Sequence, residues 1–153
     1  MPREKSAGAI IFRLKDGMPY YLLLHYHSGH WEFARGHVEE GEDQLETAKR
    51  EIEEETGIRD LRIVEGFKGY TKFSFKRTWN LRPEEKNHVP WIFKIVTLYL
   101  AQTQTETVRI SDEHTGFTWL KYEDAIKKLP KDAKKVFKEA NDYLMRHETK
   151  KVF

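Results

Sequence analysis

The stretch GHVEEGEDQLETAKREIEEETGI occupies residues 36–58 of this 153-residue chain. The second part of this stretch has the pattern of an α-helix, and residues typical of a helix start and a helix end stand on either side of it. Asp43 is followed three positions later by Glu46, a capping-box pattern typical of a helix start. Gly57 stands where a residue in the left-handed conformation commonly ends a helix. We therefore expect a helix over residues 44–56.

One flank of this helix carries a row of carboxylates. With about 100° per residue, Ala48 and Ile52 fall on a narrow apolar stripe, and Glu51, Glu54 and Glu55 fall together beside it. Like charges at this spacing repel and raise one another's pKa, so the cluster costs stability without a cation. A hard divalent ion such as Mg²⁺ prefers carboxylate and water oxygens and would reverse that cost. A solvated, Glu-rich helix face has the same spacing, so spacing alone leaves both interpretations open.

Length and composition indicate one domain over residues 1–153. Charged residues make up 34% of the chain, and no apolar run approaches the roughly 20 residues that span a bilayer. The short apolar stretch near the start lacks a cleavage site, so we expect a cytoplasmic protein without a signal peptide. There is no cysteine, which excludes thiolate metal sites and thiol nucleophiles. The net charge of +2 is nearly balanced, but basic residues gather between residues 68 and 86.

The remaining pattern is typical of an α/β fold. Apolar and β-branched runs predict a hairpin from residues 6–14 and 20–26, with a turn at residues 15–17. Further strands are expected within residues 61–75, 91–101 and 117–120. A C-terminal amphipathic helix follows from the spacing of Ala133, Val136, Phe137, Ala140, Tyr143 and Leu144. Residues 76–90 form the one long polar connection.

The central stretch resembles the Nudix box at every defined position. The box has a Gly, a Glu six residues later, an Arg-Glu-aliphatic-any-Glu-Glu element, and then a Gly and an aliphatic residue. Here these are Gly36, Glu42, the hexapeptide beginning at Arg50, Gly57 and Ile58. The resemblance implies an α/β/α sandwich around a mixed β-sheet. It also implies a metal-dependent hydrolase in which water attacks one phosphorus of a nucleoside diphosphate-linked compound.

The same resemblance assigns roles to residues of the box. It implies that Glu51 and Glu55 are the principal metal ligands, with Glu54 assisting and the carbonyl of Gly36 as a further ligand. The expected ion is Mg²⁺, with Mn²⁺ as the alternative. The resemblance gives structural roles to three residues: a buried pair of Glu42 and Arg50 that ties the loop to the helix, and Gly57 at the helix end. Glu55 is favoured as the general base, and Glu113 is the contender.

Several segments are similar to the asymmetric diadenosine tetraphosphate hydrolases, which form ATP and AMP. They are His30-Trp31, Gly36-His37-Val38-Glu39, Gly41-Glu42-Asp43, Leu45-Glu46-Thr47-Ala48, Glu65-Gly66-Phe67-Lys68, and a Glu-His pair at Glu113. Two departures stand out. Ala34-Arg35 replaces Pro-Lys, and Phe73 falls where a substrate-contacting tyrosine is expected.

Contacts to the substrate are predicted from residue chemistry, because aromatic rings stack on adenine and cations hold phosphates. The candidates are His30, Arg35, Lys72, Phe73, Trp79, Lys86 and Tyr143. The partner is then a small nucleotide, with neither a membrane nor DNA expected, and the protein a monomer or homodimer. Alternative substrates are ADP-ribose, an oxidised nucleoside triphosphate, an RNA 5′ end or a diphosphoinositol polyphosphate. A non-catalytic nucleotide-sensing module is the other alternative, although the intact carboxylates argue against it.

Overall fold

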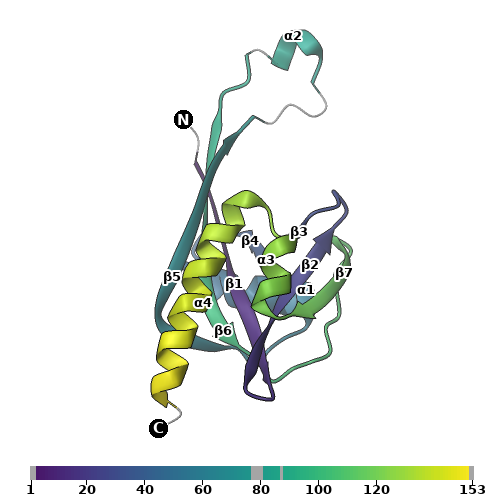
Figure 1. Ribbon diagram of the computed structural model, residues 1–153. Helices are drawn as coiled ribbons and strands as arrows, with labels where there is room; N and C mark the ends of the chain where they lie inside the picture. Colours follow the sequence, from purple (N-terminus) through teal and green to yellow (C-terminus); the bar gives the residue numbers. More distant parts are fainter. Residues whose placement is uncertain (1–2, 77–80, 87, 152–153) are drawn as a thin grey trace.

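The computed structural model describes residues 3–76, 81–86 and 88–151 (Figure 1). Its strands are β1 (Arg3–Lys15), β2 (Met18–Tyr26), β3 (Trp31–Glu32), β4 (Ala34–His37), β5 (Arg62–Phe75), β6 (Ile92–Gln102) and β7 (His114–Leu120). Its helices are α1 (Gln44–Thr56), α2 (Pro83–Lys86), α3 (Tyr122–Lys128) and α4 (Lys131–Lys151). No described helix is long and apolar enough to cross a membrane.

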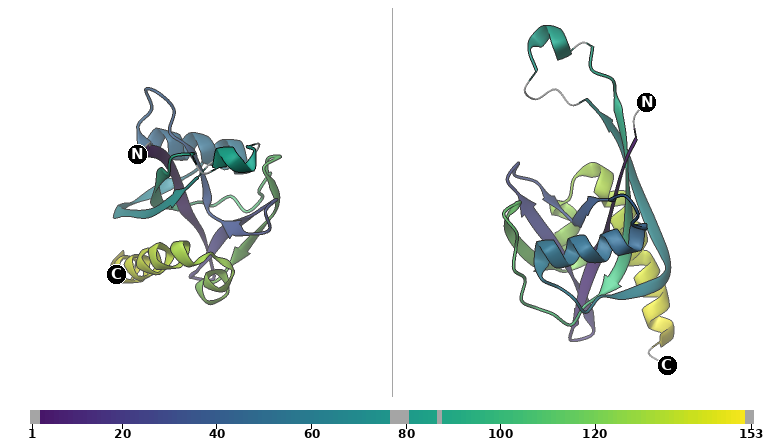
Figure 2. Two further views of the ribbon diagram at one scale, coloured as in Figure 1. Left: turned by 90° about the horizontal axis from the view of Figure 1, so that it is seen from above. Right: turned by 180° about the vertical axis from the view of Figure 1, so that it is seen from behind.

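The strands form one mixed sheet between two layers of helices. The strand order is β3-β2-β1-β6-β5, with β4 beside β1 and β7 beside β2. The central strands β1 and β6 are parallel, whereas the other pairs are antiparallel. Helix α1 lies on one side of the sheet, and α3 and α4 lie on the other (Figure 2). The expected α/β/α sandwich around a mixed sheet is therefore confirmed.

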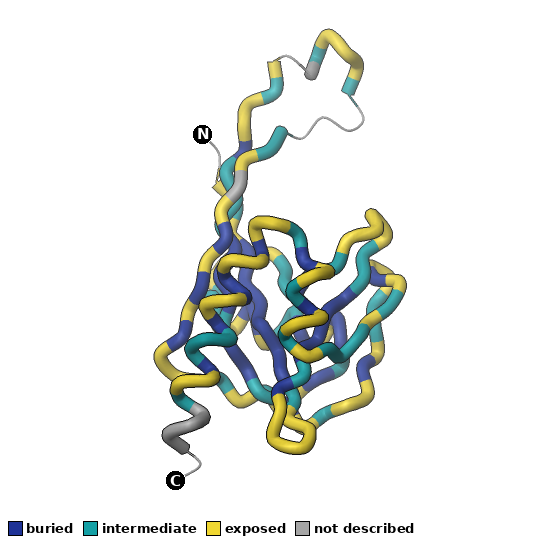
Figure 3. Tube along the Cα trace, in the orientation of Figure 1, coloured by how far each residue is buried: buried dark blue, intermediate teal, exposed yellow. Residues whose placement is uncertain are grey.

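Strand β1 shows how both faces of the sheet are buried. Ile10 and Phe12 point into a core shared with α4, and Ala9 and Ile11 point into a second core shared with α1. Since all four residues are at most 1% exposed, the strand reads in the sequence as a continuous apolar run rather than an alternation. Figure 3 shows the resulting buried centre of the molecule.

Helix α1 has the predicted bounds and caps. The side chain of Asp43 accepts a hydrogen bond from the backbone N–H of Glu46 at 2.8 Å. Gly57 has φ of +79°, and its N–H donates to the carbonyl of Glu53 at 2.8 Å. A positive φ is easy only for glycine, so both ends of the helix are fixed by local chemistry.

Other elements differ from the expectation. Strand β4 and the two-residue β3 were not predicted, because such short segments carry no readable period. Strand β7 begins at His114 rather than at residue 117. Helix α3 was not anticipated, since it has only seven residues and no side-chain cap.

Strands β5 and β6 continue past the helices as an arm (Figures 1 and 3). We use "the arm" for residues 70–75 of β5, α2, and residues 92–97 of β6. Residues 3–7 of β1 pair with β6 at its base, where Arg3 lies beside Phe93. The arm therefore begins as a three-stranded sheet and ends in the short helix α2.

Candidate active site

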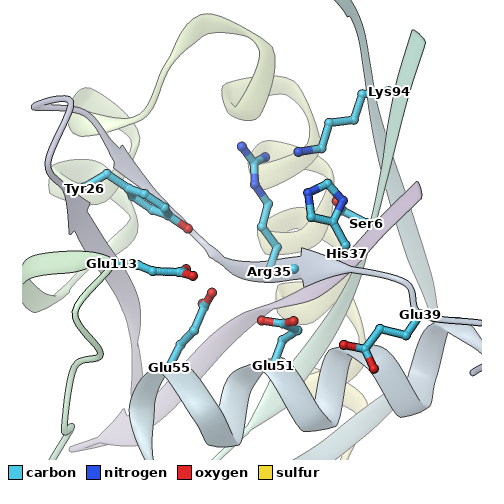
Figure 4. A pocket seen from close by; sticks show the side chains of 10 residues that line it. Ser6, Tyr26, Arg35, His37, Glu39, Glu51, Glu55, Lys94 and Glu113 are labelled. Carbon is cyan, nitrogen blue, oxygen red and sulfur yellow. The ribbon is translucent and has the colours of Figure 1, made fainter. Parts of the chain in front are cut away.

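Helix α1 presents two carboxylates to a cavity of about 420 Å³ (Figure 4). Glu51 and Glu55 lie one turn apart on the side of the helix that faces β4. Glu55 is only 3% exposed and so belongs to the buried face of α1 rather than to its edge. The other lining residues are Ser6, Tyr26, Arg35, Gly36, His37, Glu39, Lys94 and Glu113.

The loop before β7 brings a third carboxylate and an imidazole to Glu55. Glu55, Glu113 and His114 each offer one ligand atom, and these atoms lie within 4.8 Å of one another. His114 Nε2 is 4.0 Å from Glu55 Oε2, and neither atom has a hydrogen-bond partner among the described residues. The sequence reasoning gave His114 no role, although its position directly after Glu113 was a usable signal. Two buried polar atoms without partners are a feature that a bound ion explains.

Burial and neighbouring charges raise the pKa of two of the cavity carboxylates. Burial and the neighbouring charges of Glu51 and Glu113 raise the pKa of Glu55 to about 8. Burial also raises the pKa of Glu51, against the effect of Arg50 beside it. A divalent cation would relieve this repulsion, and oxygen with imidazole is a donor set that such ions accept. The residues present therefore fit a divalent metal ion.

Gly36 makes room for the carboxylate of Glu51. A Cβ at position 36 would lie 1.9 Å from Glu51 Cδ, far inside van der Waals contact. Gly36 has no positive φ and pairs with Ala7 as an ordinary residue of β4. The requirement for glycine here is one of space, because the backbone must come close to the carboxylate.

Arg50 ties the loop before α1 to the helix. Its guanidinium donates to both carboxylate oxygens of Glu42, at 2.6 and 3.0 Å, and to the carbonyl of His37 at 3.1 Å. It also donates to Glu51 at 2.9 Å. Hydrogen bonds from Arg50 hold the pKa of Glu42 at about 2, so this pair is charged at neutral pH. Arg50 thereby positions both the loop and one cavity carboxylate.

The structure separates Glu54 from the other two carboxylates. The Glu54 side chain is 59% exposed and lies 3.3 Å from Arg50, and it does not line the cavity. Glu54 and Glu55 are consecutive in the helix, and a rotation of about 100° per residue points their side chains in different directions. The metal roles predicted for Gly36, Glu51, Glu54 and Glu55 stay predictions.

Cations line the side of the cavity opposite the carboxylates (Figure 4). Arg35 projects from β4 and Lys94 from β6, and the Tyr26 hydroxyl points between them and Glu113. Arg35 lies 3.4 Å from the buried Glu32, which holds it beside the sheet. Arg35 was predicted to contact substrate, whereas Tyr26 and Lys94 were not. A lone lysine within the apolar run of residues 91–101 was the signal for Lys94.

The other predicted substrate contacts are scattered. The His30 ring stacks on Tyr26, with centroids 5.1 Å apart, and so lies next to the cavity. Tyr143 is elsewhere, because its hydroxyl donates to the Glu65 carbonyl and its ring stacks on His147. Lys72 pairs with Ile95, so it lies on the opposite face of the sheet from Lys94. Trp79 lies outside the described residues, as do the side chains of Phe73 and Lys86.

Comparisons with known proteins show which sequences and structures this chain is similar to. The NUDIX domain model matches residues 2–140. The asymmetrical bis(5′-nucleosyl)-tetraphosphatase of Sus scrofa is 34% identical over 154 residues, covering 92% of this chain and 95% of that protein. An RNA pyrophosphohydrolase of Bartonella bacilliformis is 28% identical, over 49% of this chain and 48% of its own. The crystal structure of a C. elegans Ap4A hydrolase binary complex is similar with a TM-score of 0.72 and 28% identity, covering 93% and 98%.

Proposed function

Since the chain belongs to the NUDIX family and is a phosphoanhydride hydrolase, we propose that its substrate is diadenosine tetraphosphate, which it splits into ATP and AMP. The observation that carries this proposal is the cavity, in which the carboxylates of Glu51, Glu55 and Glu113 lie opposite the cations of Arg35 and Lys94. A chain of four phosphates fits between such walls, because one side can hold metal ions and the other can bind phosphate oxygens directly.

The extent of the similarity supports the tetraphosphate over an RNA 5′ end. The similarity to the Sus scrofa enzyme extends over almost the whole of both chains, including β6, which carries Lys94, and the loop before β7, which carries Glu113. The similarity to the RNA pyrophosphohydrolase covers about half of each chain. Substrate choice in such enzymes depends on the parts outside the catalytic helix, so the longer match is the more informative one.

We assign the metal site to Glu51, Glu55 and Gly36, with Mg²⁺ as the ion and Glu54 in an assisting role. The unpartnered oxygen of Glu55 and the close approach of Gly36 to Glu51 support this assignment. When bound, a divalent cation supplies positive charge that neutralises the phosphoryl oxygens as the bond breaks.

The protein's own residues then carry the proton and orient the phosphates. Glu55 accepts a proton from the attacking water, whose oxygen forms a bond to phosphorus while the bond from phosphorus to the bridging oxygen breaks. Glu113 lies beside Glu55 and is the alternative base. Arg35 and Lys94 bind the phosphate oxygens on the opposite wall, and the charge of the leaving phosphate stays near them. The stacked rings of His30 and Tyr26 offer a platform for one adenine.

The proposal is tested by hydrolysis of diadenosine tetraphosphate in oxygen-18 water with Mg²⁺. We expect ATP and AMP in equal amounts, with the label in one of them, and loss of turnover in Glu55→Gln. The matched control is Glu53→Gln on the exposed flank of the same helix, which should keep full activity. If the wild-type protein leaves this substrate intact but releases diphosphate from triphosphorylated RNA, or cleaves ADP-ribose, the proposed substrate is wrong.

A further inference from the structure

The arm and the part of the sheet at its base have a second face that does not contribute to the cavity. Ser6 and Lys94 line the cavity, so residues in alternate positions of β1 and β6 point to the other side of the sheet. Residues of this other face that lie side by side on β1, β6 and β5 form rows across the sheet. The rows are Arg3, Phe93 and Ser74; Lys5, Ile95 and Lys72; Ala7, Thr97 and Tyr70; and Ala9, Tyr99 and Lys68. We call this set of residues the α1-side face.

The α1-side face is positively charged. Arg3, Lys5, Lys68 and Lys72 are all exposed and come from the two strands that flank β6. At its lower end lies a groove of about 460 Å³, lined by Lys5, Lys68 and Tyr99 together with residues at the start of α1. The acidic groups in that groove already have partners. Glu42 is paired with Arg50, and Asp43 caps α1. Four cations therefore remain to attract an anionic partner.

Aromatic rings lie between these cations. Tyr70 is 51% exposed, and Phe93 and Tyr99 are partly exposed. The Lys68 ammonium lies 5.6 Å from the centre of the Tyr99 ring. Residues on one face of a strand recur about every 7 Å, which is comparable with the length of one extended nucleotide unit. A sheet face that alternates rings and cations can stack unpaired bases while its cations contact the backbone phosphates.

We propose that the α1-side face binds single-stranded RNA. A second copy of this chain would bring four further cations against these four, so charge disfavours a dimer through this face. A duplex would keep its bases stacked inside, so the exposed ring of Tyr70 would have no base to contact. Tyr70 and Ser74 are exposed residues, and their hydroxyls can form hydrogen bonds with the ribose 2′-hydroxyl, which favours RNA over DNA. This binding is independent of the cavity and of its substrate.

The experiment measures fluorescence anisotropy of a labelled 12-nucleotide RNA with a 5′-hydroxyl end, in EDTA and at several salt concentrations. Such an RNA has no phosphoanhydride bond, so hydrolysis cannot disturb the result. With four phosphate contacts, log K should fall with log salt with a slope of about −2.8, that is about 50-fold between 50 and 200 mM. Neutralising two cations in Lys5→Gln/Lys68→Gln should reduce the slope to about −1.4. Tyr70→Ala should weaken binding by roughly 5- to 150-fold while leaving the slope unchanged.

The matched control is Lys134→Gln/Lys135→Gln, which removes the same charge from the exposed side of α4. It should bind RNA as the wild type does, and all variants should hydrolyse the small substrate at the wild-type rate, which shows that they are folded. The proposal is overturned if both double variants lower the affinity equally, or if DNA or duplex RNA binds as tightly as the single strand. Binding to anionic lipid vesicles without binding to RNA would overturn it as well.

Discussion

Replacing Glu55 by Gln should make the metal-free protein more stable at pH 8. The Glu55 carboxyl is buried beside two like charges, which raises its pKa in the folded state from 4.5 to about 8. The folded protein thus holds a proton that the unfolded chain has lost between these two pH values, so stability falls as pH rises across this window. At about 1.4 kcal/mol for each pH unit, the full cost at pH 8 is about 5 kcal/mol. A buried amide retains a desolvation cost of about 1–3 kcal/mol, which leaves a gain of roughly 2–4 kcal/mol.

The assay is urea unfolding in EDTA at pH 8 and at pH 5, for the wild type, Glu55→Gln and Glu53→Gln. The gain from Glu55→Gln should be present at pH 8 and absent at pH 5, where the wild-type carboxyl is already protonated in the folded state and the variant should be no more stable than the wild type. Glu53 is exposed, so its replacement should change stability by no more than about 0.5 kcal/mol at either pH. A Glu55→Gln protein that is no more stable than the wild type at pH 8 would refute the reasoning.

Four further predictions concern the metal and its surroundings. Mg²⁺ at about 100 times its Kd should stabilise the wild type by about 2.7 kcal/mol in thermal unfolding, and Glu51→Gln should lose most of that gain. Gly36→Ala places a methyl group 1.9 Å from Glu51 Cδ, so a Mg²⁺ titration of the hydrolysis rate should show about tenfold weaker affinity or worse, with an unchanged circular dichroism spectrum. Glu42→Gln should lower the hydrolysis rate about tenfold or more by freeing the loop from Arg50, whereas Glu40→Gln on the exposed part of that loop should not. Glu54→Gln should reduce the rate less than Glu51→Gln does, and equal losses would contradict the exposed position of Glu54.

The sequence predicted the catalytic helix well because its ends depend on local chemistry. Asp43 and Gly57 act on backbone groups within a few residues of themselves, and no distant part of the fold is needed to interpret them. The main strands were also predictable, since long apolar runs are typical of strands that are buried on both faces. Only their bounds shifted by a few residues.

The composition of the cavity was harder to predict because it depends on strand register. Lys94 reaches the cavity and Lys72 does not, although both are lysines in strands, because neighbouring positions of paired strands alternate between faces. Helical spacing grouped Glu54 with Glu51 and Glu55, but the position of β4 decides which of them is covered. Tyr143 has the spacing of a core residue, and the structure uses it to join α4 to β5.

The parallel pairing of β1 with β6 has a consequence for how the chain folds during synthesis. Strand β1 is synthesised long before β6, yet it becomes the centre of the sheet, and Ala7 pairs with Thr97 only after β6 has been made. Until then, β2 and β4 are the only partners that the described strands offer to β1, and its long edge toward β6 stays open. Such long-range pairing slows folding and leaves the nascent chain open to aggregation. Arrest of translation shortly before β6 should therefore yield a species that binds chaperones, whereas the chain that includes β6 and α4 should resist protease, since α4 covers one of the two cores.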